Sequence, residues 1–355
     1  MRQPPNRIRR YLLVVAALLG VAALVAGCGS SSGATASSDT TAAAGGADAP
    51  KTITIAYQNI PNGDLIVKDQ GWLEDAFPDT DIQWKLFDSG GAVNEAVTAG
   101  SVDFGLAGSS PVSRGLSTKL PYQVPWIHDV IGEAEALVVK GNGGITDLKG
   151  LAGKKIATPF ASTSHYSLLA ALDDAGVDPT TVDIIDAEPD DIYAAWTRGD
   201  IDGAYVWNPN LASMISDGGK VLVTSADLAK KGFTTYDLAV VTDSFATKYP
   251  AAVTTWAEQQ NRAVELLDSD PEAAAASIAK QLNLTDEEAQ AQIEDLIFLT
   301  ADEQTGADYL GGGLAKNLYA AAQFNQKLGK IDAVQPESWY VDAVNATFAQ
   351  EAAAK

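Results

Sequence analysis

Four consecutive polar side chains between an expected strand and an expected helix are the residues best suited to bind a ligand. In the sequence KKIATPFASTSHYSLLAAL, residues 154–172, a β-like run stops at Pro159 and a helical apolar pattern begins near Tyr166. A helix start offers unpaired backbone N–H groups and the positive end of the helix dipole, which suits an anion. One polar residue would be explained as an N-cap, but a run of four indicates a ligand site. The four residues are Ser162, Thr163, Ser164 and His165.

Other candidate residues follow the ends of expected strands in the same way. Ligands of open α/β sheets bind beyond the carboxyl ends of the strands. The segments expected there are YQN at 57–59, GSSP at 108–111, the run 162–166 and YVW at 205–207. Two acidic residues lie on extended runs that connect the halves of the chain. The candidate ligand contacts outside the polar run are Gln58, Ser109, Ser110, Glu135, Tyr166, Tyr205, Trp207 and Asp237.

An internal repeat indicates how the chain positions these residues. Residues 96–103 read AVTAGSVD and residues 195–202 read AWTRGDID, with identical residues at four equivalent positions. Each copy is typical of a helix end, a glycine C-cap and a following strand. The strands that open each half are spaced alike as well, so we expect two related β-α-β lobes. Asp103 and Asp202 close the two copies, which favours a structural role for Asp202 over ligand binding.

Two apolar, strand-like runs at 135–140 and 236–241 join the halves, which predicts a hinged clamshell. The alternation of strands and helices predicts an α/β fold with mostly parallel sheets. We expect the first lobe to comprise residues 51–138 and the second lobe residues 139–240. Residues 241–355 are expected to return to the first lobe and to cover it with amphipathic, alanine-rich helices.

The amino terminus predicts export and a lipid anchor. Four arginines among residues 2–10 precede an apolar run at 11–26, which ends in small residues before Cys28. This order is that of a secretory signal, and the run is short of the roughly 20 apolar residues of a membrane span. The junction resembles the lipobox of bacterial lipoproteins, so we expect a signal at 1–27, a lipid on Cys28 and an extracytoplasmic location at the cell membrane. A plain signal peptide with an incidental cysteine is the alternative.

Composition argues against several classes of function. The 355 residues carry a formal net charge of −22. Such an acidic chain argues against nucleic-acid binding and against electrostatic docking on anionic lipid. Residues 28–50 are almost all glycine, serine, threonine, alanine and aspartate, which predicts a flexible tether. With two histidines and one cysteine, we expect no metal site, no intramolecular disulfide and no cofactor.

From about residue 52 to the C-terminus, the chain resembles the taurine-binding proteins of bacterial ABC importers, within the wider sulfonate and nitrate binding family. The stretches HYSLLAAL and RGDIDGAYVW are long and unusual in composition, which makes the resemblance specific. Ala134 departs from it where a serine is expected, and the neighbours of Asp237 also differ, although Asp237 itself is retained. The most similar segments are 55–58, 87–90, 108–111, 134–140, 159–172 and 199–207.

The resemblance implies a two-lobed, type II periplasmic-binding-protein-like fold. It also implies a monomeric, non-enzymatic protein that captures taurine, 2-aminoethanesulfonate, and delivers it to the permease of an ABC importer. In such a protein Glu135 and Asp237 would hold the ammonium group, while hydroxyls and the helix start near Ser164 would hold the sulfonate. The implied sulfonate donors are Ser109, Ser110, Thr163 and His165, and the implied aromatic wall is Tyr57, Tyr166, Tyr205 and Trp207.

Two other interpretations remain open. Another alkanesulfonate or a small anion such as nitrate is the nearer alternative, and the two carboxylates argue against it because such ligands carry no cation. The distant alternative is a lipid-anchored serine hydrolase that uses Ser109 or Ser164 with His165. Adjacent residues seldom act as nucleophile and base, because a triad is normally assembled from separate segments.

Overall fold

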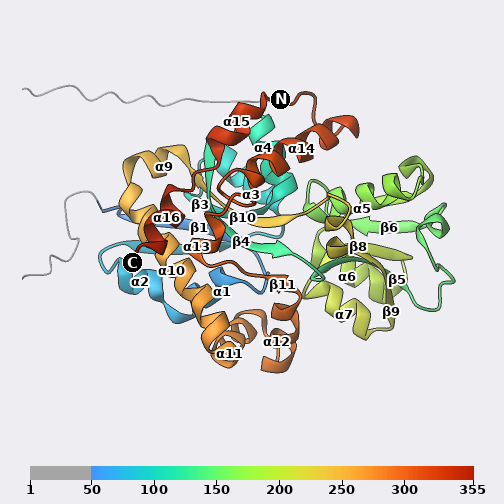
Figure 1. Cartoon of the computed structure of the whole chain (residues 1–355). Coiled ribbons are helices and arrows are strands. Elements are labelled where there is room, and N and C mark those ends of the chain that lie inside the picture. Colours follow the sequence, from blue (N-terminus) through green and yellow to red (C-terminus); the bar gives the residue numbers. More distant parts are fainter. Residues whose placement is uncertain (1–48) are drawn as a thin grey trace, which may run out of the picture. The chain divides into compact units, whose positions relative to one another are not determined.

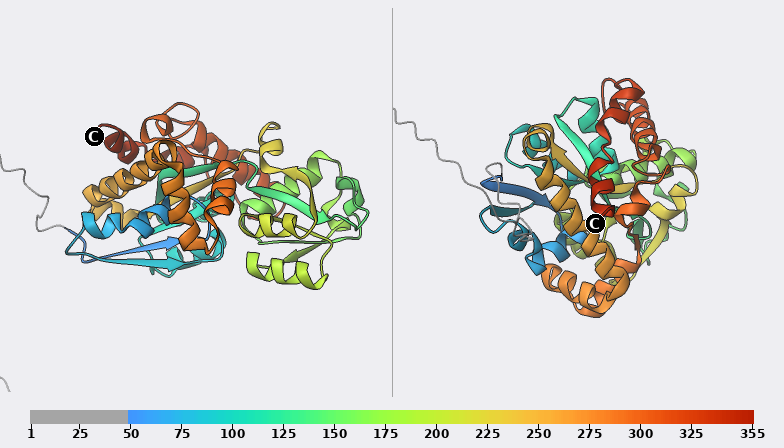
Figure 2. Two further views of the ribbon diagram at one scale, coloured as in Figure 1. Left: turned by 90° about the horizontal axis from the view of Figure 1, so that it is seen from below. Right: turned by 60° about the vertical axis from the view of Figure 1, so that its left-hand side comes forward.

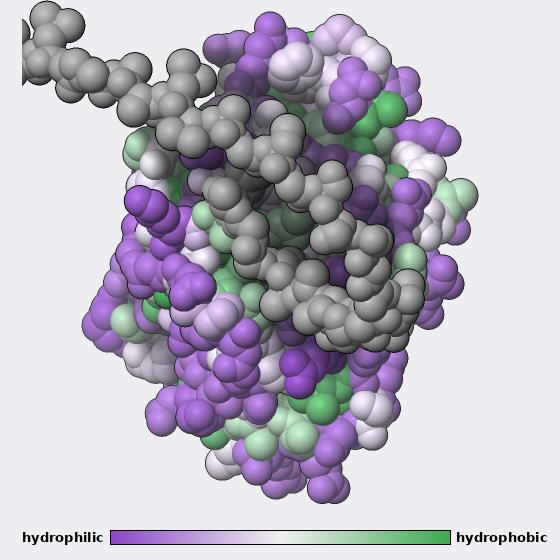
Figure 3. Space-filling model, turned by 90° about the vertical axis from the view of Figure 1, so that its left-hand side faces the viewer, coloured by the Kyte–Doolittle hydropathy of each residue, from purple (hydrophilic) through white to green (hydrophobic). Residues whose placement is uncertain are grey.

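A computed structural model describes residues 49–355, which form two β-sheets with helices around each (Figure 1). The expected signal at 1–27, Cys28 and nearly all of the expected tether at 28–50 lie outside the described residues. Among the helices that are described, none combines the length and the apolar character needed to cross a bilayer. Figure 3 shows one face of the molecule, on which hydrophilic side chains predominate, as the acidic composition leads one to expect.

The larger sheet contains β1 (Thr52–Tyr57), β2 (Asp81–Leu86), β3 (Phe104–Gly108), β4 (Tyr122–Ile131), β10 (Tyr236–Thr242) and β11 (Leu296–Ile297). Their order in the sheet is β11-β4-β10-β3-β1-β2. β1 is parallel to β2 and β3, whereas β10 is antiparallel to β3 and β4. β3 and β10 are buried along their whole length; β3 is apolar throughout, whereas β10 carries Asp237 near its start.

The smaller sheet contains β5 (Glu135–Lys140), β6 (Lys155–Thr158), β7 (Asp183–Asp186), β8 (Gly203–Trp207) and β9 (Gly219–Thr224). Their order is β7-β6-β8-β5-β9, in which β6 is parallel to β7 and β8 while β5 is antiparallel to β8 and β9. Both sheets are therefore mixed and not mostly parallel. The physical reason is that β5 and β10, the strands next to the crossings between the sheets, are antiparallel to both of their neighbours.

The internal repeat is confirmed by the strand order. The arrangement β2-β1-β3 recurs as β7-β6-β8, with α3 (Gly90–Thr98) and α6 (Pro189–Arg198) in equivalent positions. Oδ2 of Asp103 accepts a hydrogen bond from the backbone N–H of Thr54, and Oδ2 of Asp202 accepts one from Lys155, both at 2.9 Å. Each aspartate thus fixes the first strand of its own repeat, which is the structural role predicted for Asp202.

Two segments connect the sheets. β5 pairs along its length with β8 and β9, so the first crossing lies at residues 132–134, and the expected boundary at 138 falls inside the smaller sheet. The return passes through α8 (Ser225–Ala229) to β10, which belongs wholly to the larger sheet. Glu135 therefore begins a strand of the smaller sheet, whereas Asp237 lies near the start of a strand of the larger one.

The chain after β10 covers the larger sheet, as the sequence predicts. Its helices share one apolar core with β1, β3, β4 and β10, and in Figure 2 they lie on the side of the larger sheet. They are α9 (Asp243–Lys248), α10 (Pro250–Ser269), α11 (Pro271–Leu282), α12 (Asp286–Glu294), α13 (Ala301–Gln304), α14 (Gly313–Lys327), α15 (Glu337–Ala343) and α16 (Thr347–Ala353).

The other elements are α1 (Gly63–Gln70), α2 (Trp72–Ala76), α4 (Ser109–Ser117), α5 (Thr163–Asp174), α7 (Asn210–Ser216) and the 3₁₀ turns at Leu148–Leu151 and Pro179–Thr181.

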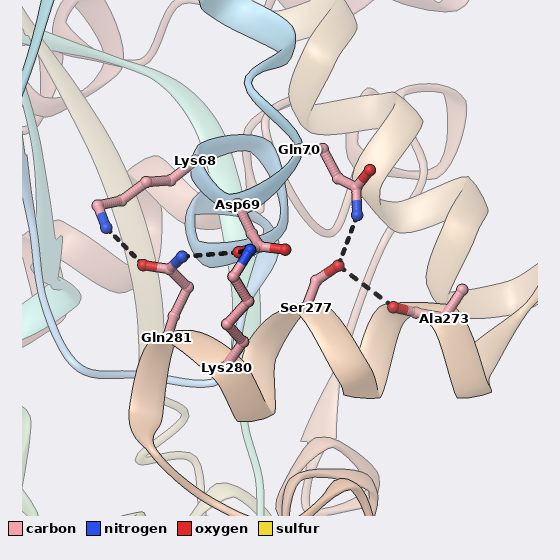
Figure 4. Close-up of polar contacts among 7 residues, drawn as sticks. All are labelled: Lys68, Asp69, Gln70, Ala273, Ser277, Lys280 and Gln281. Carbon is pink, nitrogen blue, oxygen red and sulfur yellow. Dashed lines mark hydrogen bonds and ion pairs between the residues drawn. The ribbon is translucent and has the colours of Figure 1, made fainter.

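Polar contacts fasten the end of α1 to α11 (Figure 4). Nε2 of Gln70 donates to Oγ of Ser277 at 2.8 Å, and Nε2 of Gln281 donates to Oδ1 of Asp69 at 2.9 Å. Lys280 forms an ion pair with the same Asp69 oxygen at 2.7 Å. Since α1 follows β1 in sequence, these contacts hold the N-terminal part of the larger lobe and the returning C-terminal helices as one body.

Candidate functional site

A cavity lies between the two lobes. It is lined from the larger lobe by Gln58, Gly90, Gly108 and Asp237, and from the smaller lobe by Glu135, Ser162, Thr163 and Trp207. Gln58 follows β1, Gly108 ends β3, and Trp207 ends β8. The cavity therefore lies beyond the carboxyl ends of the strands, where the α/β topology predicts a ligand.

Two helix starts come together at one side of this cavity. α4 begins directly after Gly108 and has no side chain that caps its first N–H groups. A Cβ at Gly108 would lie 2.4 Å from Cγ2 of Thr163, so only glycine lets α4 approach the start of α5 this closely. The uncapped N–H groups of α4 and its dipole make this side of the cavity suitable for an anion.

Asp237 adds a buried carboxyl group to the lining of the cavity, and its side chain is 6% exposed. Asp237 is the direct partner of Gly108 on β3 and of Asp129 on β4. Burial, and secondarily the charge of Glu135, raise the pKa of Asp237 to about 7. This side of the cavity concentrates negative charge and is suited to a cation.

Glu135 is the second buried carboxylate of the cavity, and four hydroxyl groups surround it. Oε2 accepts from Thr163 at 2.5 Å and from Ser164 at 2.9 Å, while Oε1 accepts from Ser225 at 2.7 Å and from Ser167 at 3.4 Å. Burial raises the pKa of Glu135, and these hydrogen bonds act in the opposite direction. The hydroxyls therefore stabilise a carboxylate that has no cationic partner within residues 49–355.

Comparison with known proteins agrees with this geometry. Residues 62–274 match the family described as NMT1/THI5 like. The taurine-binding periplasmic protein of Escherichia coli K12 is 36% identical over 275 residues, which covers 76% of this chain and 84% of the relative.

The chain belongs to the NMT1/THI5-like family.

Solved structures show the fold that this NMT1/THI5-like protein shares. The alkanesulfonate-binding protein SsuA of Xanthomonas axonopodis, bound to MOPS, aligns with a TM-score of 0.70 and 22% identity, over 83% of this chain and 98% of that one. The periplasmic aliphatic sulphonate binding protein SsuA of Escherichia coli aligns with a TM-score of 0.66 and 22% identity, over 82% and 92%. The chain therefore has the two-lobed periplasmic-binding-protein fold.

In this NMT1/THI5-like protein, several expected ligand contacts have other partners. Oγ of Ser162 accepts from the backbone N–H of His165 at 3.1 Å and so caps α5, while Ser164 is fully buried against Glu135. Oγ of Ser109 accepts from the N–H of Tyr236, and Oγ of Ser110 accepts from Asn325. Neither Ser109 nor Ser110 lines the cavity, so their side chains anchor α4 while its backbone faces the ligand site.

The expected aromatic wall is reduced to Trp207. Tyr205 is fully buried, with its hydroxyl 3.2 Å from that of Ser225, and Tyr166 packs edge-on against Phe324. Tyr57 packs edge-on against Trp84. None of these three tyrosines lines the cavity. The resemblance implies a wall that includes Tyr57 and Tyr205, on β1 and β8, and Tyr166, on α5, but their rings turn into the packing of each lobe.

His165 does not line the cavity either. Its ring stacks on Phe160 with centroids 4.3 Å apart and planes at 15°. Burial, followed by the charges of Lys330 and Arg114, lowers the pKa of His165 to about 3, so the ring is neutral near pH 7. A neutral, stacked imidazole beside a capped helix start has neither the position nor the partner of a catalytic base.

The sequence interpretation missed Asp129 on β4. Its side chain is fully buried, and no donor lies at hydrogen-bonding distance of either carboxylate oxygen within residues 49–355. Burial and then the charge of Asp237 raise the pKa of Asp129 well above its usual value, and the neighbouring Asn62 acts against this. An acidic residue in the middle of the buried strand sequence YQVPWIHDVI was the available signal.

The remaining lining of the cavity contains no lysine, arginine or histidine. Arg114 lines a separate surface pocket, as does Lys330. Within residues 49–355, histidine, cysteine and acidic side chains form no group of three that could hold a metal ion. An anion in this cavity would thus be bound by neutral donors, and a cation by carboxylates.

Proposed function

We propose that this chain is an extracytoplasmic solute-binding protein that captures taurine and delivers it to an ABC importer. The observation that carries the proposal is the mixed character of the cavity lining, which combines the uncapped start of α4 with the buried carboxyl groups of Asp237 and Glu135. A zwitterion with a sulfonate at one end and an ammonium at the other matches both sides. The taurine-binding relative from Escherichia coli supports this choice.

The anionic end of taurine fits the α4 side of the cavity. A sulfonate is a permanent anion with weakly basic oxygens, so several neutral donors suit it better than one charged partner. The N–H groups after Gly108 supply such donors, and Gln58, whose Nε2 donates to Leu106 at 2.9 Å, adds an amide held in place by the sheet. Trp207 offers an apolar surface for the two-carbon linker.

The ammonium end fits the carboxylate side. Asp237 comes from the larger sheet and Glu135 from the smaller one, so an ammonium between them contacts both lobes. A ligand that makes more contacts in one conformation shifts the population toward it. Taurine is therefore expected to favour the closed arrangement that a permease can recognise.

Membrane attachment belongs to the same proposal. The sequence at Cys28 is that of a lipidation site, and residues 28–50 would tether the binding domain to the cell membrane. We expect the protein to act as a monomer.

A second candidate function is the binding of another alkanesulfonate, which the solved sulfonate-binding structures favour. Such a ligand would use the α4 side of the cavity and leave the carboxylates without a cation. Isolated charges are costly to bury, so the second candidate gives no reason for Asp237 and Glu135 to line the cavity. Nitrate carries no cation either, so it also gives no reason for these two carboxylates to line the cavity.

Calorimetric titration of residues 29–355 with taurine, ethanesulfonate, nitrate and sulfate tests the proposal. We expect taurine to bind most tightly. Asp237→Asn should weaken taurine by roughly tenfold or more, because a charge-assisted hydrogen bond contributes about 1.5–3 kcal/mol and about 1.4 kcal/mol is a factor of ten. The same change should leave ethanesulfonate binding equal or tighter.

Asp295→Asn is the matched control. Oδ2 of Asp295 accepts from Asn208 at 3.0 Å, so this carboxylate lies near the cavity without lining it. We expect it to have little effect on the preference for taurine. Tighter binding of ethanesulfonate than of taurine to the unmodified protein would instead support the alkanesulfonate function.

A further inference from the structure

Asp129 and Asp237 are neighbours on adjacent antiparallel strands. The register of β4 and β10 makes the two residues direct partners, so their side chains project from the same face of the sheet. Asp129 is 0% exposed and Asp237 is 6% exposed. Two carboxyl groups thus lie side by side with almost no access to water.

No cation offsets these two carboxyl groups within the part of the chain that the structure describes. None of the ion pairs there involves Asp129 or Asp237, and the neutral amide of Asn62 is the neighbouring donor that acts on Asp129. His128 is next to Asp129 on β4, but its Nε2 lies 3.7 Å from Asp64, and burial lowers the pKa of its ring, which disfavours a cation there.

The other charged groups around the pair are acidic. Glu135 on β5 faces the same cavity and is stabilised by four hydroxyls. Asp295 lies beside β11 and bonds to Asn208. α1 contributes Asp64, which is paired with His128 and with Gln260. The charge outside the pair that acts on both groups is that of Glu135, which is negative, and repulsion between like charges is strong in a site of low polarity.

Two adjacent buried carboxylates that lack a cation commonly share one proton, since this removes one of the two charges. The effect of burial on Asp129 and Asp237 is in the same direction, because it raises the pKa of both groups. A cation in the cavity beside Asp237 would compensate the second negative charge and make the shared proton unnecessary.

We propose that Asp129 and Asp237 share one proton in the empty protein, and that the ammonium group of the ligand displaces this proton on binding. In this exchange one carboxyl O–H bond breaks and the proton passes to solvent, while N–H groups of the ammonium donate to Asp237, which lines the cavity, and the positive charge compensates Asp129 behind it. The charge of the site is the same before and after, since one positive charge replaces another. The inference rests on the proposed function, because it requires a ligand with an ammonium group.

The exchange makes Asp129 a specificity-determining residue. A sulfonate with an apolar end cannot displace the proton, so it binds to the protonated pair without any gain from the second carboxylate. An aminosulfonate gains both carboxylates but competes with the proton. Its affinity should therefore increase with pH until the pair is ionised without ligand, by up to tenfold per pH unit for one released proton.

The decisive measurement is the number of protons released on binding. Taurine is titrated into the unmodified mature protein at pH 6 in two buffers of different ionisation enthalpy, and the difference in heat gives the protons exchanged. We expect close to one proton released per taurine and none per ethanesulfonate. Equal heats for taurine in both buffers would overturn the shared proton while leaving taurine binding intact. Absence of taurine binding would overturn both this inference and the proposed function.

Substitutions of the acidic residues test which groups hold the proton that is released on binding. Asp129→Asn removes one carboxyl group and leaves an amide that can donate to Asp237, so proton release should fall to near zero and the affinity for taurine should lose most of its pH dependence. Asp295→Asn, the matched acidic control outside the lining, should keep the release of about one proton. Unchanged proton release in a folded Asp129→Asn protein would show that the proton belongs elsewhere. If this variant does not fold, the two-buffer titration of the unmodified protein still decides whether taurine displaces a proton.

Discussion

Ser89 and Glu188 join the two lobes through the starts of equivalent helices. Oγ of Ser89 donates to Oε1 of Glu188 at 3.2 Å, where Ser89 is the N-cap of α3 and Glu188 is the N-cap of α6. α3 and α6 occupy the same place in the two copies of the repeat. The contact therefore bridges the mouth of the cleft by a hydrogen bond between corresponding positions of the two lobes.

Glu188→Ala should favour the open arrangement. The variant removes this bridge but not a cap, because the Glu188 side chain makes no capping hydrogen bond to α6. A hydrogen bond of this kind contributes about 0.5–1.5 kcal/mol, so taurine affinity should fall roughly two- to tenfold. Scattering without ligand should give a larger radius of gyration, which taurine then reduces.

Glu188→Gln is the control for that prediction, because glutamine retains an acceptor oxygen and removes only the charge. Burial and then the nearby acids Asp88, Asp186 and Asp191 raise the pKa of Glu188, so removal of its charge should not weaken closure. Equal losses of affinity in the alanine and glutamine variants would show that the bridge does not contribute.

The hydroxyl groups around Glu135 should differ in their effect on stability. Ser225 donates to Oε1 at 2.7 Å, whereas Ser167 is 3.4 Å from the same atom, beyond the usual O–H···O range. Ser225→Ala should lower the free energy of unfolding by about 1.5–3 kcal/mol, since it removes a hydrogen bond to a buried charge. Ser167→Ala should lower the free energy of unfolding by clearly less than Ser225→Ala does. Urea unfolding of both variants at pH 7 compares them, and equal costs would contradict the proposed order.

The sequence was sufficient to predict the repeat and the place of the cavity. Strand order and helix starts follow from local patterns, and Glu135, Thr163, Trp207 and Asp237 all line the predicted cleft. The direction of individual side chains was harder to predict. α5 begins at Thr163 and not near Tyr166, and this shift turns Ser164 and Ser167, three residues apart on one helix face, toward Glu135.

Asp129 shows the other reason why sequence reasoning was incomplete. Its significance depends on the register between β4 and β10, two strands more than a hundred positions apart, and no local pattern contains that pairing. Tyr205 and Trp207 were correctly placed on one strand, but only the residue at the strand end reaches the cavity. How far each strand residue lies from the cavity depends on how the two lobes meet, and local sequence patterns do not contain that information.

Membrane attachment can be tested independently of ligand binding. If Cys28 carries the lipid, Cys28→Ser should move the protein from the membrane fraction to the soluble fraction, because the lipid is the anchor that the sequence predicts. The taurine affinity of the released protein should equal that of residues 29–355. Fractionation and calorimetry make the two measurements. A Cys28→Ser protein that remains in the membrane fraction would contradict the lipid anchor.

The pair Asp129 and Asp237 also predicts how the empty protein responds to pH. The folded state raises the pKa of Asp237 from its usual 3.8 to about 7, so between these values the folded protein binds more protons than the unfolded chain. Stability from this group is fully present below about pH 4 and is lost as the pH rises toward 7. One pKa unit corresponds to about 1.4 kcal/mol, so between pH 5 and pH 8 the loss is about 3 kcal/mol.

Unfolding free energies of the unmodified protein and of Asp237→Asn, measured from pH 5 to pH 8, isolate the contribution of the pair, because the titrating groups outside it are common to both proteins. The difference between the two curves should change by about 3 kcal/mol across the range, with the unmodified protein losing relative stability as the pH rises. Saturating taurine should offset much of the loss at pH 8, since its ammonium compensates the ionised pair. Parallel curves without ligand would show that Asp237 is already ionised at pH 5, and would remove the physical basis for a shared proton.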